Sequence, residues 1–149
     1  MKKNEEILKK EIEGYSDYKL IYQCLALLLE TKGKNSVQQY LKDKHICNIV
    51  IYGAGCVGKV LSQYINEMDT CNILGIIDIN KNTAYGFDKF IDLSELKTID
   101  YDLCIVTPVH KYDVICQALD KNGIQKYCSV WELIDYLRRN QMYENDISC

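Results

Sequence analysis

The chain has 149 residues, a net charge of −3 at pH 7, and 48% hydrophobic against 26% charged residues. This length suits one domain with a small extension, and the absence of a basic excess excludes binding to nucleic acid or anionic membranes by bulk electrostatics. The longest apolar run, Leu25–Leu29, is far shorter than the ~20 residues of a membrane-spanning helix. The acidic residues of the N-terminal Met-Lys-Lys-Asn-Glu-Glu argue against a signal peptide. We therefore expect a cytoplasmic protein.

Helical patterns precede the first strand. Apolar residues at three-to-five-residue spacing predict a helix over residues 4–31, ended by Gly33. From Leu20 to Leu29 this helix is apolar on nearly every side, so another surface must cover it. Ser36-Val-Gln-Gln39 fits a capping box and predicts a short second helix. We expect residues 1–45 to form a helical extension that packs on the sheet and contributes to a homodimer or to the surface of a partner enzyme.

Strands and helices alternate along the rest of the chain. Continuous apolar strands separated by helices imply a parallel sheet covered on both faces, with right-handed crossovers and the strand order 3-2-1-4-5. This α/β domain spans residues 46–138, and residues 139–149 form a polar tail. The five predicted strands are Ile49–Tyr52, Ile73–Ile77, a weak strand at Lys89–Ile91, Leu103–Thr107 and Gln125–Cys128.

Four helical segments are predicted among these strands. The first carries its apolar face from Val57 to Met68, and the second is a single turn over Asp92–Leu96. In the third helix, the apolar face toward the sheet consists of Val114, Ile115, Ala118 and Leu119, and the helix ends at Gly123. The last is opened by a capping box at Ser129–Glu132 and runs through Leu137.

A glycine motif follows the first strand. Gly53, Gly55 and Gly58 have the spacing Gly-x-Gly-x-x-Gly, and Asp78 ends the second strand twenty residues later. This pairing is the dinucleotide-binding fingerprint of a doubly wound, Rossmann-like sheet. The first glycine permits a tight turn, the second lets a pyrophosphate approach the backbone, and the third lets the helix pack closely. The helix N-terminus then offers N–H groups and positive potential to phosphates.

Asp78 also bears on the choice of dinucleotide. Its carboxylate would accept hydrogen bonds from ribose hydroxyls and repel a 2′-phosphate, which favours NAD over NADP. Lys81 lies near enough to soften that preference. In the other interpretation, the glycines serve the turn alone, and the site is empty or holds another ligand.

A second loop, Thr107-Pro108-Val-His110-Lys111-Tyr112, follows the fourth predicted strand. In a doubly wound sheet it lies beside the glycine turn, at the point where ligands bind. His110 could exchange a proton and Lys111 could hold a phosphate or carboxylate, so both are weak catalytic candidates. The alternative is that they are solvated loop residues and that Pro108 shapes the turn.

The eight cysteines form no Cys-x-x-Cys pair, and most lie in apolar runs. We expect reduced, mostly buried thiols and no metal site. Cys56 is distinguished by its place at a helix N-terminus, where the dipole would lower a thiol pKa.

Three segments carry a family resemblance: Ile49–Lys59, Gly75–Asn80 and Tyr101–Leu119. They resemble the nucleotide-binding module of bacterial nucleotide-sugar epimerase/dehydratases and polysaccharide-biosynthesis proteins. The loop after the fourth strand is also similar to the NAD-binding half of glucose-fructose-oxidoreductase-like dehydrogenases, although their Glu-Lys-Pro motif has no counterpart at Lys126–Val130. Gly53–Leu61 is similar to the N-terminal domain of sugar O- and N-acyltransferases, where the same turn holds a UDP-sugar.

The resemblance implies a nucleotide-binding, NAD-favouring module of sugar-nucleotide or polysaccharide metabolism that lacks a complete active site. One alternative is an NAD-dependent sugar-nucleotide oxidoreductase or epimerase/dehydratase with a site formed across a dimer. Another is a UDP-sugar-binding module that regulates or docks a glycosyltransferase, and a third is a purely structural protein. The implied cofactor-binding residues are Gly53, Ala54, Gly55, Cys56, Val57, Gly58, Asp78, Ile79, Thr107 and Pro108.

Overall fold

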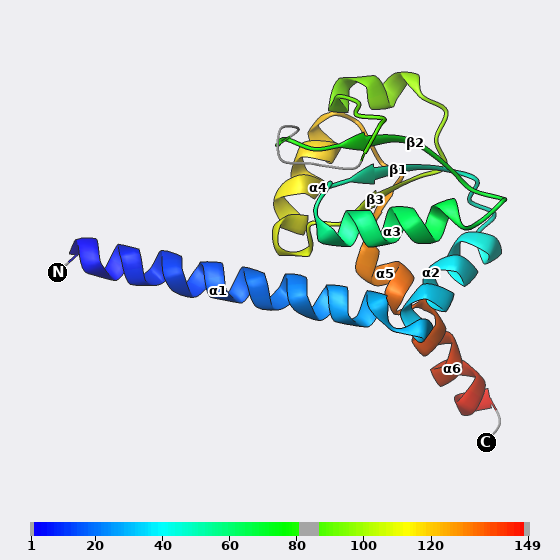
Figure 1. Ribbon diagram of the computed structural model, residues 1–149, viewed down its shortest axis with the longest axis horizontal. Coiled ribbons are helices and arrows are strands. Elements are labelled where there is room, and N and C mark those ends of the chain that lie inside the picture. The colour runs from blue at the N-terminus through cyan, green and yellow to red at the C-terminus, as the bar shows by residue number, and fades with distance from the viewer. Residues whose placement is uncertain (1, 81–86, 148–149) are drawn as a thin grey trace.

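A four-stranded, all-parallel sheet lies at the centre of the protein, as described by a computed structural model covering residues 2–80 and 87–147 (Figure 1). Its strand order is β2-β1-β3-β4, with β1 paired to both β2 and β3. The short apolar runs of the sequence form these strands because buried parallel strands need apolar side chains on both faces. The strands are β1 (Asn48–Tyr52), β2 (Asn72–Ile77), β3 (Leu103–Val106) and β4 (Tyr127–Ser129). The predicted α/β class and parallel sheet are confirmed.

The expected third strand is not a strand of this sheet. The segment near Lys89–Ile91 contributes an isolated parallel bridge between Ile76 and Phe90. Two hydrogen bonds flank it: Ile76 N donates to Lys89 O at 2.7 Å, and Ile91 N donates to Ile76 O at 2.9 Å. The five-strand order 3-2-1-4-5 is therefore not observed, because this segment touches the edge of β2 at one point only. Residues 81–86, with Lys81, lie outside the described residues.

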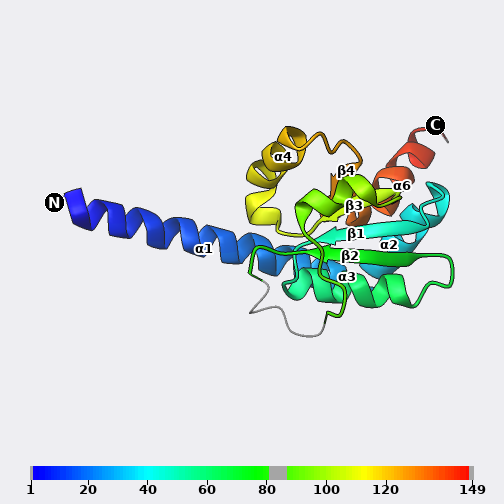
Figure 2. The same ribbon diagram turned by 90° about the horizontal axis from the view of Figure 1, so that it is seen from above.

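Two apolar layers cover the sheet, because alternate residues of each strand face opposite sides. Ile49 and Ile51 of β1 belong to one core cluster, and Val50 and Tyr52 belong to the other. Figure 2 shows helices above and below the strands. The first cluster is completed by α2 (Thr31–Asp43), α3 (Cys56–Asn66), α5 (Val130–Ile134) and the end of α1 (Lys2–Leu29). The second is completed by η2 (Leu93–Thr98) and α4 (Tyr112–Lys121).

The boundary between α1 and α2 differs from the prediction. The helix breaks at Glu30, which has an extended backbone, and Gly33 lies buried inside α2 instead of ending α1. A Cβ at Gly33 would lie 2.1 Å from Leu27 O. The glycine therefore lets α2 cross closely over the last turn of α1, and this role depends on tertiary contact.

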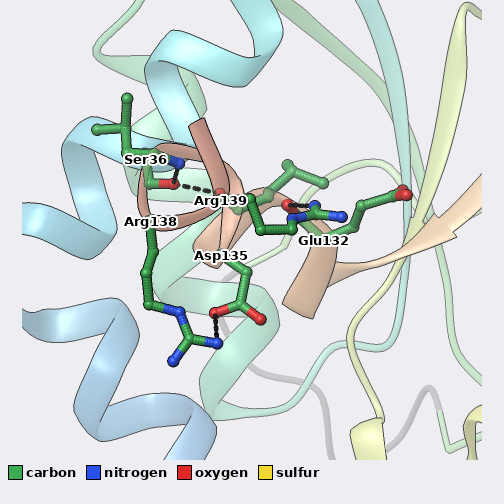
Figure 3. A network of polar contacts seen from close by, with 7 residues as sticks. Ser36, Glu132, Asp135, Arg138 and Arg139 are labelled. Carbon is green, nitrogen blue, oxygen red and sulfur yellow. Dashed lines mark hydrogen bonds and ion pairs between the residues drawn. The ribbon is translucent and has the colours of Figure 1, made fainter. Parts of the chain in front are cut away.

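Ser36 is not the predicted helix cap. It is buried in α2, where its hydroxyl donates to Leu133 O at 2.6 Å and accepts from Leu137 N at 3.1 Å. Figure 3 shows this hydroxyl aimed at the α5 backbone, beside the Asp135–Arg138 ion pair. Ser36 thus joins α2 to the C-terminal helices.

The N-terminal part of α1 extends away from the body of the protein (Figures 1 and 2). Cys24 and Leu28, near its end, are buried, whereas Tyr15 and Tyr18 are 75% and 76% exposed. The expectation that the helix packs on the sheet holds only for its last turns. No helix in the described ranges has the length and hydropathy needed to cross a bilayer.

The C-terminal segment also differs from the prediction. Ser129 caps α5 as expected, with its hydroxyl accepting from Trp131 N at 3.2 Å. The helix predicted to run through Leu137 ends at Ile134, and after Asp135 the chain continues as helix α6 (Tyr136–Ile147), which extends into residues 139–149 where a polar tail was predicted. Tyr136 packs edge-to-face on Tyr40 of α2 with ring centroids 5.2 Å apart, and its hydroxyl donates to Asp43 at 2.7 Å. Packing against α2 supports the start of a helix whose polar sequence gave little signal.

The smaller predictions are mostly confirmed. Asp92 and Glu95 form a capping box at η2, and the apolar face of α3 is buried. In α4, Ile115 and Leu119 are buried, but Val114 is 68% exposed, so its predicted place in the core is wrong. Val114 lies in the first turn of α4 and lines the cleft described below.

Candidate functional site

The turn after β1 depends on Gly53 and Gly58. Gly53 has φ 108°, a left-handed conformation that favours glycine, and a Cβ there would lie 2.4 Å from Thr107 Oγ1. A Cβ at Gly58 would lie 2.2 Å from Gly53 O. Because α3 packs this closely on the turn, both glycines are required for the local fold independently of any ligand.

Gly55 has a different environment. It is exposed at the N-cap of α3 with ordinary φ −82°, and no atom of the described residues lies within 4 Å of the position that a Cβ would take. Within the described part of the chain, no side chain makes a capping hydrogen bond to the first turn of α3. The backbone conformation of Gly55 is one that other residues can adopt, and a side chain at this position would occupy the space beside the N-terminus of α3.

Asp78 joins β2 to the glycine turn. Its Oδ2 accepts from Ala54 N at 2.7 Å and its Oδ1 accepts from Asn80 N at 2.7 Å. The predicted acid therefore lies beside the turn, as its sequence position suggested. The amide of Ala54 is already occupied by this carboxylate, and Ala54 itself is buried.

Thr107 joins the loop after β3 to the same turn. It is buried, and its hydroxyl oxygen lies 3.0 Å from Tyr52 O and 3.2 Å from Gly53 O. The single hydroxyl hydrogen is donated to these two carbonyl oxygens in a shared hydrogen bond. The hydroxyl therefore serves the backbone. Pro108 contacts the position that a Gly53 side chain would take, which explains why the two loops fit so closely.

His110 and Lys111 belong to a short 3-10 turn, η3 (Val109–Lys111), that leads into α4. The Nδ1 atom of His110 is enclosed and has no hydrogen-bond partner among the described residues. Lys111 is exposed at the N-cap of α4. An enclosed imidazole nitrogen without a partner is unusual in proteins and marks a place where a polar ligand group would gain a hydrogen bond.

These loops enclose a cleft of about 520 Å³ at the carboxyl ends of β1, β2 and β3. The order β2-β1-β3-β4 places the chain's change of direction at β1 and β3, where clefts of open parallel sheets form. All the predicted site residues except Ala54 line it, and sequence reasoning missed Ile21, Tyr52, Asn80, Val114 and Ile115. Ile21 could not be found from local pattern, because it comes from α1, which passes the cleft only in the folded protein.

A second cavity of about 350 Å³ adjoins the first. The two share His110, Lys111 and Val114, and Ser129 and Trp131 also line the second. His110 therefore lines two neighbouring spaces, one at the glycine turn and one at the end of β4.

The cysteines in the described residues are all free thiols. Cys24 and Cys104 are buried, and burial raises the pKa of each thiol to about 12. Cys71 and Cys128 are also buried and Cys116 is half-buried, whereas Cys47 and Cys56 are exposed, so the expectation of mostly buried thiols is confirmed for the described cysteines. Cys56 lines the cleft at the start of α3.

Comparison with known proteins gives one finding. No curated protein and no solved structure matches the chain. A family model described as "C2185-like, N-terminal" matches residues 45–129, from just before β1 to the end of β4. This segment is more than half of the chain and includes the whole sheet with the loops of the cleft, and on that basis the protein belongs to the C2185-like N-terminal domain family.

Proposed function

We propose that the protein is a Rossmann-type nucleotide-binding module whose cleft holds the pyrophosphate and adjacent ribose of a dinucleotide, NAD in preference to NADP. The observation that carries the proposal is the meeting of Gly55, the uncapped N-terminus of α3 and Asp78 around one cleft of about 520 Å³. Each of these features suits a different part of the same ligand.

The pyrophosphate would lie over Gly55. Its open Cβ position and the uncapped first turn of α3 supply space, N–H donors and positive potential, which phosphates require at a helix N-terminus. A cradle that a Cβ would fill is an argument for a ligand, because the fold itself does not need glycine there.

The ribose would lie at Asp78. Each carboxylate oxygen accepts one backbone N–H and keeps a further lone pair for a ribose hydroxyl. The negative charge disfavours a 2′-phosphate at the same place, which supports the preference for NAD. NAD would supply a hydride-accepting ring, and His110 and Lys111 are the polar side chains available beside the far end of the cleft.

A UDP-sugar is the second candidate ligand. The cavity of about 350 Å³ beyond His110 would suit a second moiety attached to a nucleotide, and Trp131 offers an aromatic face there. A role in sugar-nucleotide or polysaccharide metabolism, beside a glycosyltransferase or as part of an oxidoreductase, is proposed on the sequence resemblance.

The test is calorimetric titration and thermal unfolding with NAD, NADH, NADP, UDP-glucose and UDP-N-acetylglucosamine. A ligand at 100 times its dissociation constant stabilises the folded state by about 2.7 kcal/mol. Gly55→Val should keep the stability of the wild type and lose the ligand shift, because the new side chain enters open space. Gln63→Val, on the exposed side of α3 and outside the cleft, is the matched control and should retain the shift.

The outcomes separate the candidates. A shift with NAD or NADH that Gly55→Val removes supports the proposal, and equal affinity for NADP contradicts the role of Asp78. A shift with UDP-sugars alone replaces the first candidate by the second. Hydride transfer to a UDP-sugar, lost in His110→Ala, would support the oxidoreductase alternative. No response to any of these nucleotides would reject nucleotide binding.

A further inference from the structure

Most of the large apolar residues that α1 exposes lie on one side of the helix. At ~3.6 residues per turn, six of the large apolar residues that α1 exposes fall within an arc of about 100°. We call these six residues the tyrosine stripe: Ile7, Leu8, Tyr15, Tyr18, Tyr22 and Leu29. The two buried residues, Cys24 and Leu28, face the body in a direction about 130° from the centre of the stripe. The stripe is therefore not the side of α1 that the body covers.

A helix of this kind is poorly supported alone. The part of α1 before Ile21 extends away from the body, and Gly14 lies in its interior (Figures 1 and 2). In proteins most of the stability of a helix comes from tertiary packing, which this part of α1 lacks, and an internal glycine costs about 1 kcal/mol relative to alanine. A row of exposed, large apolar side chains on such an element marks an interaction site.

We propose that the tyrosine stripe binds the same stripe of a second copy, so that two α1 helices pair in antiparallel orientation. An antiparallel pair that crosses near Glu13 brings Leu8 level with Tyr18 of the second copy. It also brings Tyr15 level with Glu11 of the second copy, where the phenol can donate to the carboxylate. Apolar and polar groups then alternate without any like-charge contact in the stripe.

Charge complementarity favours this orientation. In the antiparallel pair, Glu5 lies within about one helical turn of Lys19 of the second copy, on the same flank, and the two-fold symmetry makes this pair twice. In a parallel, in-register pair Glu11 would face Glu11 of the second copy inside the stripe, which is unfavourable. Gly14 has nothing within 4 Å of its Cβ position and lies near the crossing, where a small residue allows close approach.

The area that such a pair would bury approaches the lower limit for a specific interface. A tyrosine buries roughly 150–250 Å², and Tyr15, Tyr18 and Tyr22 are 75%, 76% and 73% exposed. Three tyrosines on each of two copies thus bury roughly 900 Å². Ile7 and Leu8 bring the total close to the ~1,200 Å² at which specific interfaces begin.

Sedimentation velocity of the full chain, from about 1 µM to about 1 mM, brackets the affinity of such an interface. We expect a concentration-dependent dimer, and a roughly tenfold or greater rise in its dissociation constant in Tyr18→Lys. Leu20→Lys, at an exposed apolar residue on the opposite side of the same helix, is the matched control and should leave the constant unchanged. A monomer at every concentration, or an equal effect of both substitutions, would overturn the proposal.

Charge exchange tests the orientation. Glu5→Lys and Lys19→Glu should each weaken the dimer, and the double variant E5K/K19E should restore it. In a parallel pair these residues lie about 21 Å apart along the axis, so restoration would be absent. Weakening by both single variants without restoration by the double variant would reject the antiparallel arrangement. Circular dichroism of each variant controls for loss of the helix itself.

Discussion

The body and the projecting part of α1 contain the same kinds of apolar side chains but differ in what covers them. Tyr40 and Tyr64 are buried in the first core cluster, whereas Tyr15, Tyr18 and Tyr22 of α1 are largely exposed. In the body, side chains far apart in sequence determine each other's positions, as in the Ser36–Leu133 contact. In the part of α1 before Ile21, only the local sequence pattern of the helix determines the structure. Substitutions should therefore have large effects in the body and small ones in the projecting helix.

The largest effect is expected at Gly58. Gly58→Ala places a methyl group 2.2 Å from Gly53 O, where backbone must move, and we expect a loss of about 3 kcal/mol in unfolding free energy. Urea unfolding measures it as a lower midpoint. Gly55→Ala is the matched control in the same turn and should stay within about 0.5 kcal/mol of the wild type. Similar losses in both variants would contradict the distinction between the two glycines.

The next effect is expected at Ser36. Ser36→Ala removes one buried donor and one acceptor and leaves Leu133 O and Leu137 N without this partner, which should cost about 2 kcal/mol. The same unfolding experiment applies. Ser16→Ala, at an exposed position of the projecting helix, should be neutral or slightly stabilising. If Ser16→Ala were as costly as Ser36→Ala, the two regions would not differ as described.

A smaller effect of opposite sign is expected at Gly14. Nothing lies near its Cβ position, so Gly14→Ala should gain up to about 1 kcal/mol of local helix stability. Far-UV circular dichroism should show more helix at unchanged midpoint of body unfolding. Gly33→Ala is the contrasting variant, because its methyl group would meet Leu27 O at 2.1 Å and destabilise the body.

The smallest effect is expected on the stability of the protein at acidic pH. Asp102 accepts from the amides of Asn48 and Cys47 at the start of β1, both at 2.8 Å, and these hydrogen bonds lower the pKa of Asp102 below its ordinary value of 3.8. A lowered pKa means that this stabilisation is fully present above the ordinary value and is lost as pH falls through the folded-state pKa. Asp102→Asn, compared with Asp100→Asn, should reduce the loss of body stability between pH 5 and strongly acidic pH. An unchanged acid profile would show that these hydrogen bonds contribute nothing.

Local pattern was sufficient for the sheet and the glycine turn. Apolar runs predicted β1, β2, β3 and β4 to within a few residues, and the glycine spacing placed Gly53, Gly55 and Asp78 at one cleft. These features depend on neighbours in sequence or on the general geometry of parallel sheets.

The features that were missed depend on distant contacts. Gly33 and Ser36 were assigned to helix ends because their types are common there, yet one allows a helix crossing and the other bonds a residue far along the chain. The start of α6 is supported by Tyr40 of α2, and Ile21 reaches the cleft only because α1 passes over η3. None of these relations has a signal within a short window of sequence.

The Thr107 hydroxyl, which bridges Tyr52 O and Gly53 O, has a consequence for kinetics. Together with the hydrogen bond from the Ala54 amide to Asp78, it links the segments that follow β1, β2 and β3 to one another in the absence of a ligand. A ligand entering such a preorganised cleft spends little free energy on ordering the loops. The association rate would then be set by diffusion and orientation, without a slow closing step. Differences in affinity among ligands would appear mainly in their dissociation rates.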